Sequence, residues 1–284
     1  MPFNSVKQVA DAIASTGEYK TAYLYKPSVT SVASAGRWQD ISMSVGTPKY
    51  NAYVGVQLEA TPMIGNANNG IYVGPVPPGK TRHILTMGAM NTSATFPLTL
   101  LLCDYLMFYP LIDQDNPDTQ YFDNPVSLTR YTDGNGVRLM FINSVQSGVP
   151  GIATVEYINQ SGVLKSVSGG FLASNLGASQ SNPLASVTLG ASTPFFPLAS
   201  GDTGIRSLVS ITYSTLPGGF CHAVLVKPLA SLNVHEQNTY SEISYLNDKM
   251  TLPKIEDGAY LNFLAQSTVA AGMSITAELT FIEG

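Results

Sequence analysis

The chain repeats a set of residue landmarks at a fixed separation of 122 residues (197 − 75 = 122 and 278 − 156 = 122). The paired residues are Pro75 and Pro197, Gly79 and Gly201, Thr81 and Thr203, Gly136 and Gly258, Leu139 and Leu261, Phe141 and Phe263, Thr154 and Thr276, and Glu156 and Glu278. Solenoid units of roughly 20–50 residues cannot bury a core alone, whereas this longer period is the size of a whole domain. We therefore interpret the chain as two related domains in tandem.

The separation shortens to 118 residues in the middle of each copy, where Cys103 matches Cys221 (221 − 103 = 118) and Pro110 matches Pro228. A length difference in one loop would explain the change. A free cysteine commonly behaves as a small buried apolar residue. The sequence therefore predicts that the two cysteines fill the same core position in the two domains, rather than form a disulfide.

The composition favours strands over helices. Only 12% of the residues are charged while 44% are hydrophobic, and long exposed helices need many Glu, Lys and Arg. Several short segments alternate apolar and polar residues between turn-forming residues, as half-buried strands do; they are 82–90, 137–145, 151–159, 205–213, 259–267 and 273–281. We predict an all-β fold of two tandem antiparallel β-sandwiches, jelly-roll-like, preceded by an N-terminal helix and an extended arm.

The repeat limits and the composition also predict domain boundaries. An N-terminal helix and arm would occupy residues 1–66, and the first sandwich residues 67–165. A segment rich in Ser, Gly, Ala and Asn would link the domains over 166–192, followed by the second sandwich over 193–284.

A helix is predicted over residues 5–16. Ser5 and Gln8 have capping-box spacing, and Gly17 is placed to end the helix. Its apolar residues recur with helical spacing and form one face: Val6, Val9, Ala10 and Ile13. The arm that follows holds the single tryptophan, Trp38. It would either cover the first domain as an edge strand and loop, or grip a neighbouring subunit.

Charge and hydropathy argue against two classes of partner. The net charge is −5 and no cluster of Lys and Arg occurs, so we expect no nucleic-acid binding. The most apolar stretch, residues 98–112, carries Asp104 and is shorter than the roughly 20 residues that a membrane-spanning helix needs. The first residues contain charges and no continuous apolar run, so we expect neither a secretory signal nor a membrane partner.

Residues 74–81, GPVPPGKT, satisfy the formal P-loop pattern. A P-loop binds phosphate through consecutive backbone N–H groups, but Pro75, Pro77 and Pro78 have none. The following residues alternate like a strand, and the second copy has Asp202 where the first has Lys80. We interpret the segment as a proline-stiffened turn and expect no nucleotide cofactor.

Other chemical motifs are weak. Asp113, Asp115, Asp118 and Asp123 could offer oxygen ligands to calcium, but their spacing differs from an EF-hand loop and the second copy lacks the cluster. The three histidines form no zinc motif and the sequence has no nucleophile elbow. We therefore expect no catalytic residues, no metal and no cofactor; an enzyme or a ligand-binding module remains the third-ranked hypothesis.

The N-terminal helix, residues 35–54 (AGRWQDISMSVGTPKYNAYV) and residues 70–87 (GIYVGPVPPGKTRHILTM) resemble a family of tailed-bacteriophage virion structural proteins. The resemblance covers chiefly residues 1–90 and brings no catalytic motif. The chain is similar to capsid decoration or cement proteins, in which β-sandwich modules bind the capsid shell and an arm connects the subunits.

The resemblance implies a non-enzymatic protein on the capsid surface of a virion, assembled in the host cytoplasm. Its partners would be the major capsid protein and neighbouring copies of the chain, with a trimer expected from fold analogy. The alternative is a tail, neck or fibre component that binds host glycans. The candidate assembly interface consists of Val6, Val9, Ala10, Ile13 and Trp38.

Overall fold

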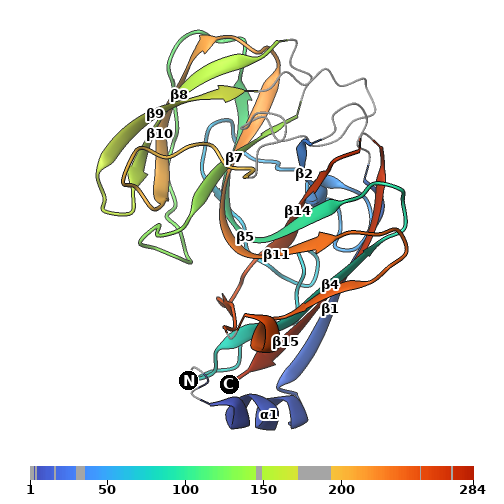
Figure 1. Ribbon diagram of the computed structural model, residues 1–284. Helices are drawn as coiled ribbons and strands as arrows, with labels where there is room; N and C mark the ends of the chain where they lie inside the picture. Colours follow the sequence, from blue (N-terminus) through green and yellow to red (C-terminus); the bar gives the residue numbers. More distant parts are fainter. Residues whose placement is uncertain are drawn as a thin grey trace.

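The computed structural model describes residues 3, 5–15, 17–29, 36–144, 149–171, 193–249, 251–269 and 271–284. The protein is elongated and consists almost wholly of antiparallel strands, with one helix lying across its lower end (Figure 1). The predicted all-β sandwich architecture is confirmed. Three sheets build it, which we call the lower, shared and upper sheets after their places in Figure 1.

The lower sheet has the strand order β1–β15–β4–β12, with β13 also paired to β4. Its strands are β1 (Tyr19–Val29), β15 (Met273–Glu283), β4 (Arg82–Asn91), β12 (Ser241–Ser244) and β13 (Lys254–Ile255). The first strand belongs to the predicted arm and forms one edge of the sheet along its whole length.

The shared sheet has the order β2–β14–β5–β11–β7, with β3 also paired to β5. Its strands are β2 (Trp38–Asp40), β14 (Leu261–Ser267), β5 (Leu98–Asp113), β11 (Phe220–Val234), β7 (Arg138–Asn143) and β3 (Thr61–Pro62). Strands β5 and β11 have 16 and 15 residues and pair along nearly all of that length. They run from one end of the sheet to the other.

The upper sheet has the order β6–β10–β8–β9. Its strands are β6 (Gln120–Tyr121), β10 (Ile205–Thr215), β8 (Gly151–Asn159) and β9 (Leu164–Phe171). The first six residues of the predicted linker, 166–171, are therefore part of β9, an edge strand that pairs with β8 on one side. The remainder of that linker, 172–192, lies outside the described residues.

The described helical elements are short. They are α1 (Val6–Ala14), the 3-10 helix η1 (Ile41–Met43) and α2 (Tyr245–Asp248). The predicted N-terminal helix is confirmed: the Ser5 hydroxyl accepts a hydrogen bond from the backbone N–H of Gln8 at 3.3 Å. Gly17 follows the helix with a φ of 94°, a left-handed conformation that suits glycine.

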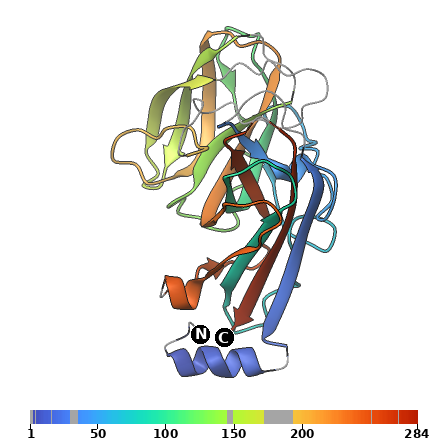
Figure 2. The ribbon, with the colours of Figure 1, turned by 45° about the vertical axis from the view of Figure 1, so that its right-hand side comes forward.

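Two cores lie on one face of the shared sheet. The lower core joins apolar side chains of the lower sheet to β14 and to one end of β5 and β11. The upper core joins side chains of the upper sheet to β7 and to the opposite end of the same two long strands. Because β5 and β11 contribute to both cores, the two sandwiches share a continuous sheet (Figures 1 and 2).

The sheets do not follow the expected division into consecutive sandwiches at 67–165 and 193–284. In the lower sandwich β4 pairs with β15 and β5 with β14, and in the upper sandwich β10 pairs with β8 and β11 with β7. Each of these pairs joins a strand of the first repeat to a strand of the second. Each sandwich is thus completed by the other repeat, and the pairs β4–β15 and β10–β8 are equivalent.

The predicted equivalence of the two cysteines is wrong. Phe141 pairs with Ala223 and Phe263 pairs with Leu102, so these long strands correspond at a separation of 121 residues (223 − 102 = 121). Cys103 then corresponds to Val224, on the face opposite the two cores, while Cys221 points into the upper core. The side chains of a strand alternate between faces, so an odd change of register reverses the direction of every side chain.

Candidate functional site

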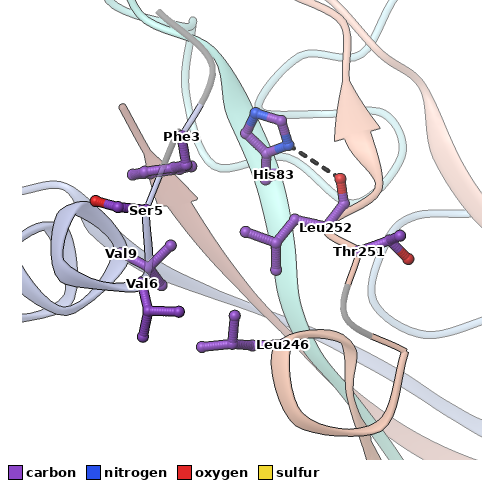
Figure 3. Close-up of a pocket in the computed structure, with 8 residues that line it drawn as sticks. All are labelled: Phe3, Ser5, Val6, Val9, His83, Leu246, Thr251 and Leu252. Carbon is purple, nitrogen blue, oxygen red and sulfur yellow. Dashed lines mark hydrogen bonds between the residues drawn. The ribbon is translucent and has the colours of Figure 1, made fainter.

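A hollow lies beside α1 at the lower end of the molecule (Figure 3). Its volume is about 240 Å³ and its lining residues are Phe3, Ser5, Val6, Val9, His83, Leu246, Thr251 and Leu252. The floor is built from β4 and from the segment after α2. Nδ1 of His83 lies 3.1 Å from the carbonyl oxygen of Leu252, and burial lowers the pKa of His83.

The helix α1 packs only part of its apolar face against the lower sheet. Val9 is 3% exposed and packs against Leu85 and Ile282 of the lower sheet. In contrast, Val6 is 66% exposed, Ile13 is 41% exposed, and Ala10 is also exposed. Of the four predicted helix residues, the structure therefore places Val9 inside the protein and leaves the other three on its surface.

The arm is built into the fold, because its strands complete the sheets. Trp38 is 3% exposed and packs in an apolar cluster between the arm and the outer face of the shared sheet. Strand β2 brings it there by pairing with β14, so that Trp38 lies opposite Gln266. Trp38 is a core residue of its own chain, which corrects its prediction as an assembly-interface residue. Of the two readings of the arm, the covering segment matches these contacts.

A buried carboxylate ties the arm to the shared sheet. The carboxylate of Asp40 accepts hydrogen bonds from the backbone N–H and the hydroxyl of Ser42 at 2.9 and 2.7 Å, and from the hydroxyls of Tyr53 and Tyr105 at 2.7 and 2.8 Å. Burial raises the pKa of Asp40, while these hydrogen bonds oppose the rise. Nearby, the ammonium group of Lys26 donates to the carbonyl oxygens of Ser44 and Pro48, and burial lowers its pKa to about 8.

A second, larger groove lies between residues 50–54 and 61–66 of the arm, with a volume of about 440 Å³. Its floor includes Phe108 and Tyr260, and its rim carries Tyr50, Val54 and Ile64. Val54 is 81% exposed, and the other two rim residues are about half exposed. This groove was not predicted from the sequence. The apolar residues of YNAYVGV were the available signal, but whether they are exposed depends on distant segments.

The P-loop-like segment is held by charged side chains of its own chain: the backbone N–H of Val76 donates to the carboxylate of Asp257 at 2.8 Å. The guanidinium of Arg82 donates to the carbonyl oxygens of Gly74 and Pro75 at 2.8 and 3.0 Å. Lys80 forms an ion pair with Glu18. These contacts fix the segment beside β4 and Glu18, and the absence of nucleotide binding stays a prediction.

The aspartates of residues 113–123 contact backbone groups of their own and a neighbouring loop. Asp113 accepts from the N–H of Asp115 at 2.9 Å, and Asp115 accepts from the N–H of Gly219 at 3.0 Å. Within the described residues, no group of three or more His, Cys, Asp or Glu side chains is placed to hold a metal ion. In the same part of the chain, no helix has the length and apolar character needed to cross a membrane.

No family model and no curated protein matches the chain. Among solved structures it has a weak structural similarity to a viral capsid protein. Infectious bursal disease virus, Gt strain, aligns with a TM-score of 0.20 and 9% identity, covering 93% of this chain and 80% of that chain. The VP2 subviral particle of infectious bursal disease virus aligns with a TM-score of 0.19, the same identity and the same coverage. These TM-scores are too low to establish a common fold.

Proposed function

We propose that the chain is a non-enzymatic structural protein of a bacteriophage virion, which decorates or cements the capsid by binding the major capsid protein and neighbouring copies. The family resemblance of residues 1–90 supports this assignment. So does a body in which both sandwiches share one sheet, because a rigid body transmits load between the subunits that it contacts.

The observation that carries the proposal is the exposure of apolar side chains around the arm groove. Tyr50, Val54, Val56 and Ile64 are all at least half exposed, and they gather within one 15-residue stretch (64 − 50 + 1 = 15). Contiguous apolar surface that a monomer leaves in water is typical of interaction sites between proteins. The exposed side of α1, which includes Val6 and Ile13, offers a second apolar surface.

The location of the protein in the virion tests the proposal. Mass spectrometry of purified particles, with heads separated from tails, should find the chain with the heads at a high copy number. Recovery with the tails instead would support the alternative of a tail, neck or fibre component. Absence from both fractions would reject a virion role.

Variants of the groove test the interface itself. Val54→Asp and Ile64→Asp each place a charge on exposed apolar surface, so they should leave the fold intact and weaken binding to heads by about tenfold or more, as desolvating a charge in an interface does. Val163→Asp is the matched control, because Val163 is half exposed on the β8–β9 turn and lies outside the groove. Equal binding by all three variants would show that the groove is not the contact.

A further inference from the structure

The outer face of the lower sheet carries an unusual number of tyrosines. The lower core takes up Ala22 and Leu24 of β1, so the alternate residues of that strand point away from the core. These outward residues include Tyr19, Tyr23 and Tyr25, and Tyr23 is 61% exposed. Tyr240, just before β12, is 49% exposed and lies toward the opposite edge of the sheet, on the same face.

Tyr240 lies across β4 because one position there has no side chain. Gly88 faces outward between Ala89 and Met87, which both point into the lower core. A Cβ atom at Gly88 would overlap the hydroxyl group of Tyr240. Glycine at this position therefore lets the hydroxyl end of the Tyr240 ring approach the backbone of β4.

Two glutamates flank the covered glycine. Glu278 of β15 and Glu242 of β12 are both register partners of Gly88, one on each side of β4. Neighbouring strands lie about 4.8 Å apart, so the two backbones are about 10 Å from one another across the sheet. Tyr23 of β1 is in turn the register partner of Glu278, so Tyr23, Glu278, Gly88 and Glu242 lie in one row across the sheet. Burial raises the pKa of Tyr240, and Glu278, Glu242 and Tyr23 raise it further.

The equivalent position in the upper sandwich has a hydrogen bond that the lower sheet lacks. Glu156 and Ser210 correspond to Glu278 and Gly88 (278 − 156 = 122 and 210 − 88 = 122), and they are also register partners. There the Ser210 hydroxyl donates to the Glu156 carboxylate at 2.7 Å. Glycine cannot make that bond, and within the described residues neither the Glu278 nor the Glu242 side-chain carboxylate has a hydrogen bond or an ion pair.

The face also lacks a cation of its own. The outward positions of β1, β15, β4 and β12 next to the two glutamates are occupied by threonine, serine, tyrosine and methionine, and none of these described positions is Lys or Arg. Two like charges thus share a surface with aromatic rings whose faces attract cations.

We propose that this surface, formed by Tyr23, Tyr240, Glu242 and Glu278, binds a lysine or arginine side chain presented by a partner protein. The cation would lie over the ring of Tyr240 between the two carboxylates, where it gains cation–π attraction and charge-assisted hydrogen bonds together. The inference extends the proposed structural role by giving the chemistry of one subunit contact.

The test is an amide chemical-shift titration of the full-length chain with the peptide Ac-Gly-Arg-Gly-Arg-Gly-NH2. We expect saturable shifts confined to the strand positions of 23, 88, 242 and 278, weakened by salt. The matched peptide with glutamine in place of arginine should give no such shifts. An equal response to both peptides, or shifts located elsewhere, would overturn the proposal.

Variants and a second ligand sharpen the test. Glu278→Gln combined with Glu242→Gln should weaken binding of the arginine peptide about fivefold or more, whereas Glu156→Gln, the equivalent residue of the upper sandwich, should not change it. Gly88→Ser should also weaken binding, because the serine hydroxyl would donate a hydrogen bond to the Glu278 carboxylate and its Cβ would displace Tyr240. Shifts with lactose but none with the arginine peptide would reject a cation site and assign the face to glycans. Virion location is measured independently, so either result can fail without the other.

Discussion

Phe141 and Phe263 occupy equivalent positions in different sandwiches, and each is paired with a long strand of the other repeat. Phe141 of β7 lies opposite Ala223 of β11, and Phe263 of β14 lies opposite Leu102 of β5. Both side chains are fully buried, one in the upper core and one in the lower. The two repeats are thus joined by exchanged strands, not merely by a linker.

This exchange predicts that neither repeat folds alone. A fragment of residues 193–284 would retain β14 and β15 but lose their partners β5 and β4. We expect it to be unfolded by circular dichroism, while the full chain unfolds in one transition. A folded fragment with native strand content would contradict the strand exchange.

Truncating either phenylalanine tests the same coupling within the intact chain. Phe141→Ala and Phe263→Ala should each cost about 3–5 kcal/mol, because each leaves a cavity in a packed core. Since β5 and β11 belong to both cores, denaturant unfolding followed by two probes should remain a single transition in both variants. Separate transitions for the two sandwiches would show that the cores are independent.

The buried Asp40 should hold the arm in place. Asp40→Ala removes the acceptor of four hydrogen bonds and leaves the buried hydroxyls of Tyr53 and Tyr105 without that acceptor. We therefore expect a loss of about 3 kcal/mol or more in the free energy of unfolding. Tyr53→Phe removes one donor and should cost about 1–2 kcal/mol. Tyr121→Phe, at an exposed position, is the control and should leave stability unchanged.

His222 should make the stability depend on acid. Burial lowers the pKa of His222 to about 4, below its ordinary 6.5, and Nδ1 accepts a hydrogen bond from the N–H of Leu111. Between these values the unfolded chain binds more protons than the folded chain, so stability falls as the pH drops from about 6.5 to about 4, by up to about 3 kcal/mol.

His222→Phe keeps a ring to stack on Tyr53 and cannot be protonated. Denaturant unfolding between pH 4 and 7 should show a shallower pH dependence for this variant than for the parent chain. Equal slopes would mean that His222 is protonated in the folded protein at these pH values.

Two valines on one helix separate the fold from the surface. Val9→Asp should destabilise the protein by several kcal/mol, because Val9 is packed on Leu85 and Ile282. Val6→Asp should leave the thermal midpoint nearly unchanged, because Val6 is mostly exposed. If Val6→Asp lowers the oligomeric state or head binding without changing stability, the exposed side of α1 is an assembly surface; no effect would exclude that role.

Much of the local structure was predictable. The alternating segments 82–90, 151–159 and 273–281 became β4, β8 and β15, because period-2 patterns reflect side chains that alternate between a core and the outside. The capped helix at Ser5 was equally clear, since its signal lies within four residues. The fates of Trp38 and of the apolar rim at Val54 were not predictable, because each depends on which distant segment covers it.

The all-β class, the duplication and the places of most strands could be read from the amino-acid sequence. The strands leave an alternating pattern in neighbouring residues, and the duplication leaves matching residues 122 positions apart. The pairing of the strands, in contrast, depends on contacts between distant parts of the chain. Two repeats with the same strand pattern can pair within themselves or with each other, since both arrangements satisfy the same backbone groups and bury the same faces. Here β5 and β11 are long enough to serve both cores, so the exchanged pairing buries Phe141 and Phe263 in sandwiches that neither repeat could complete alone.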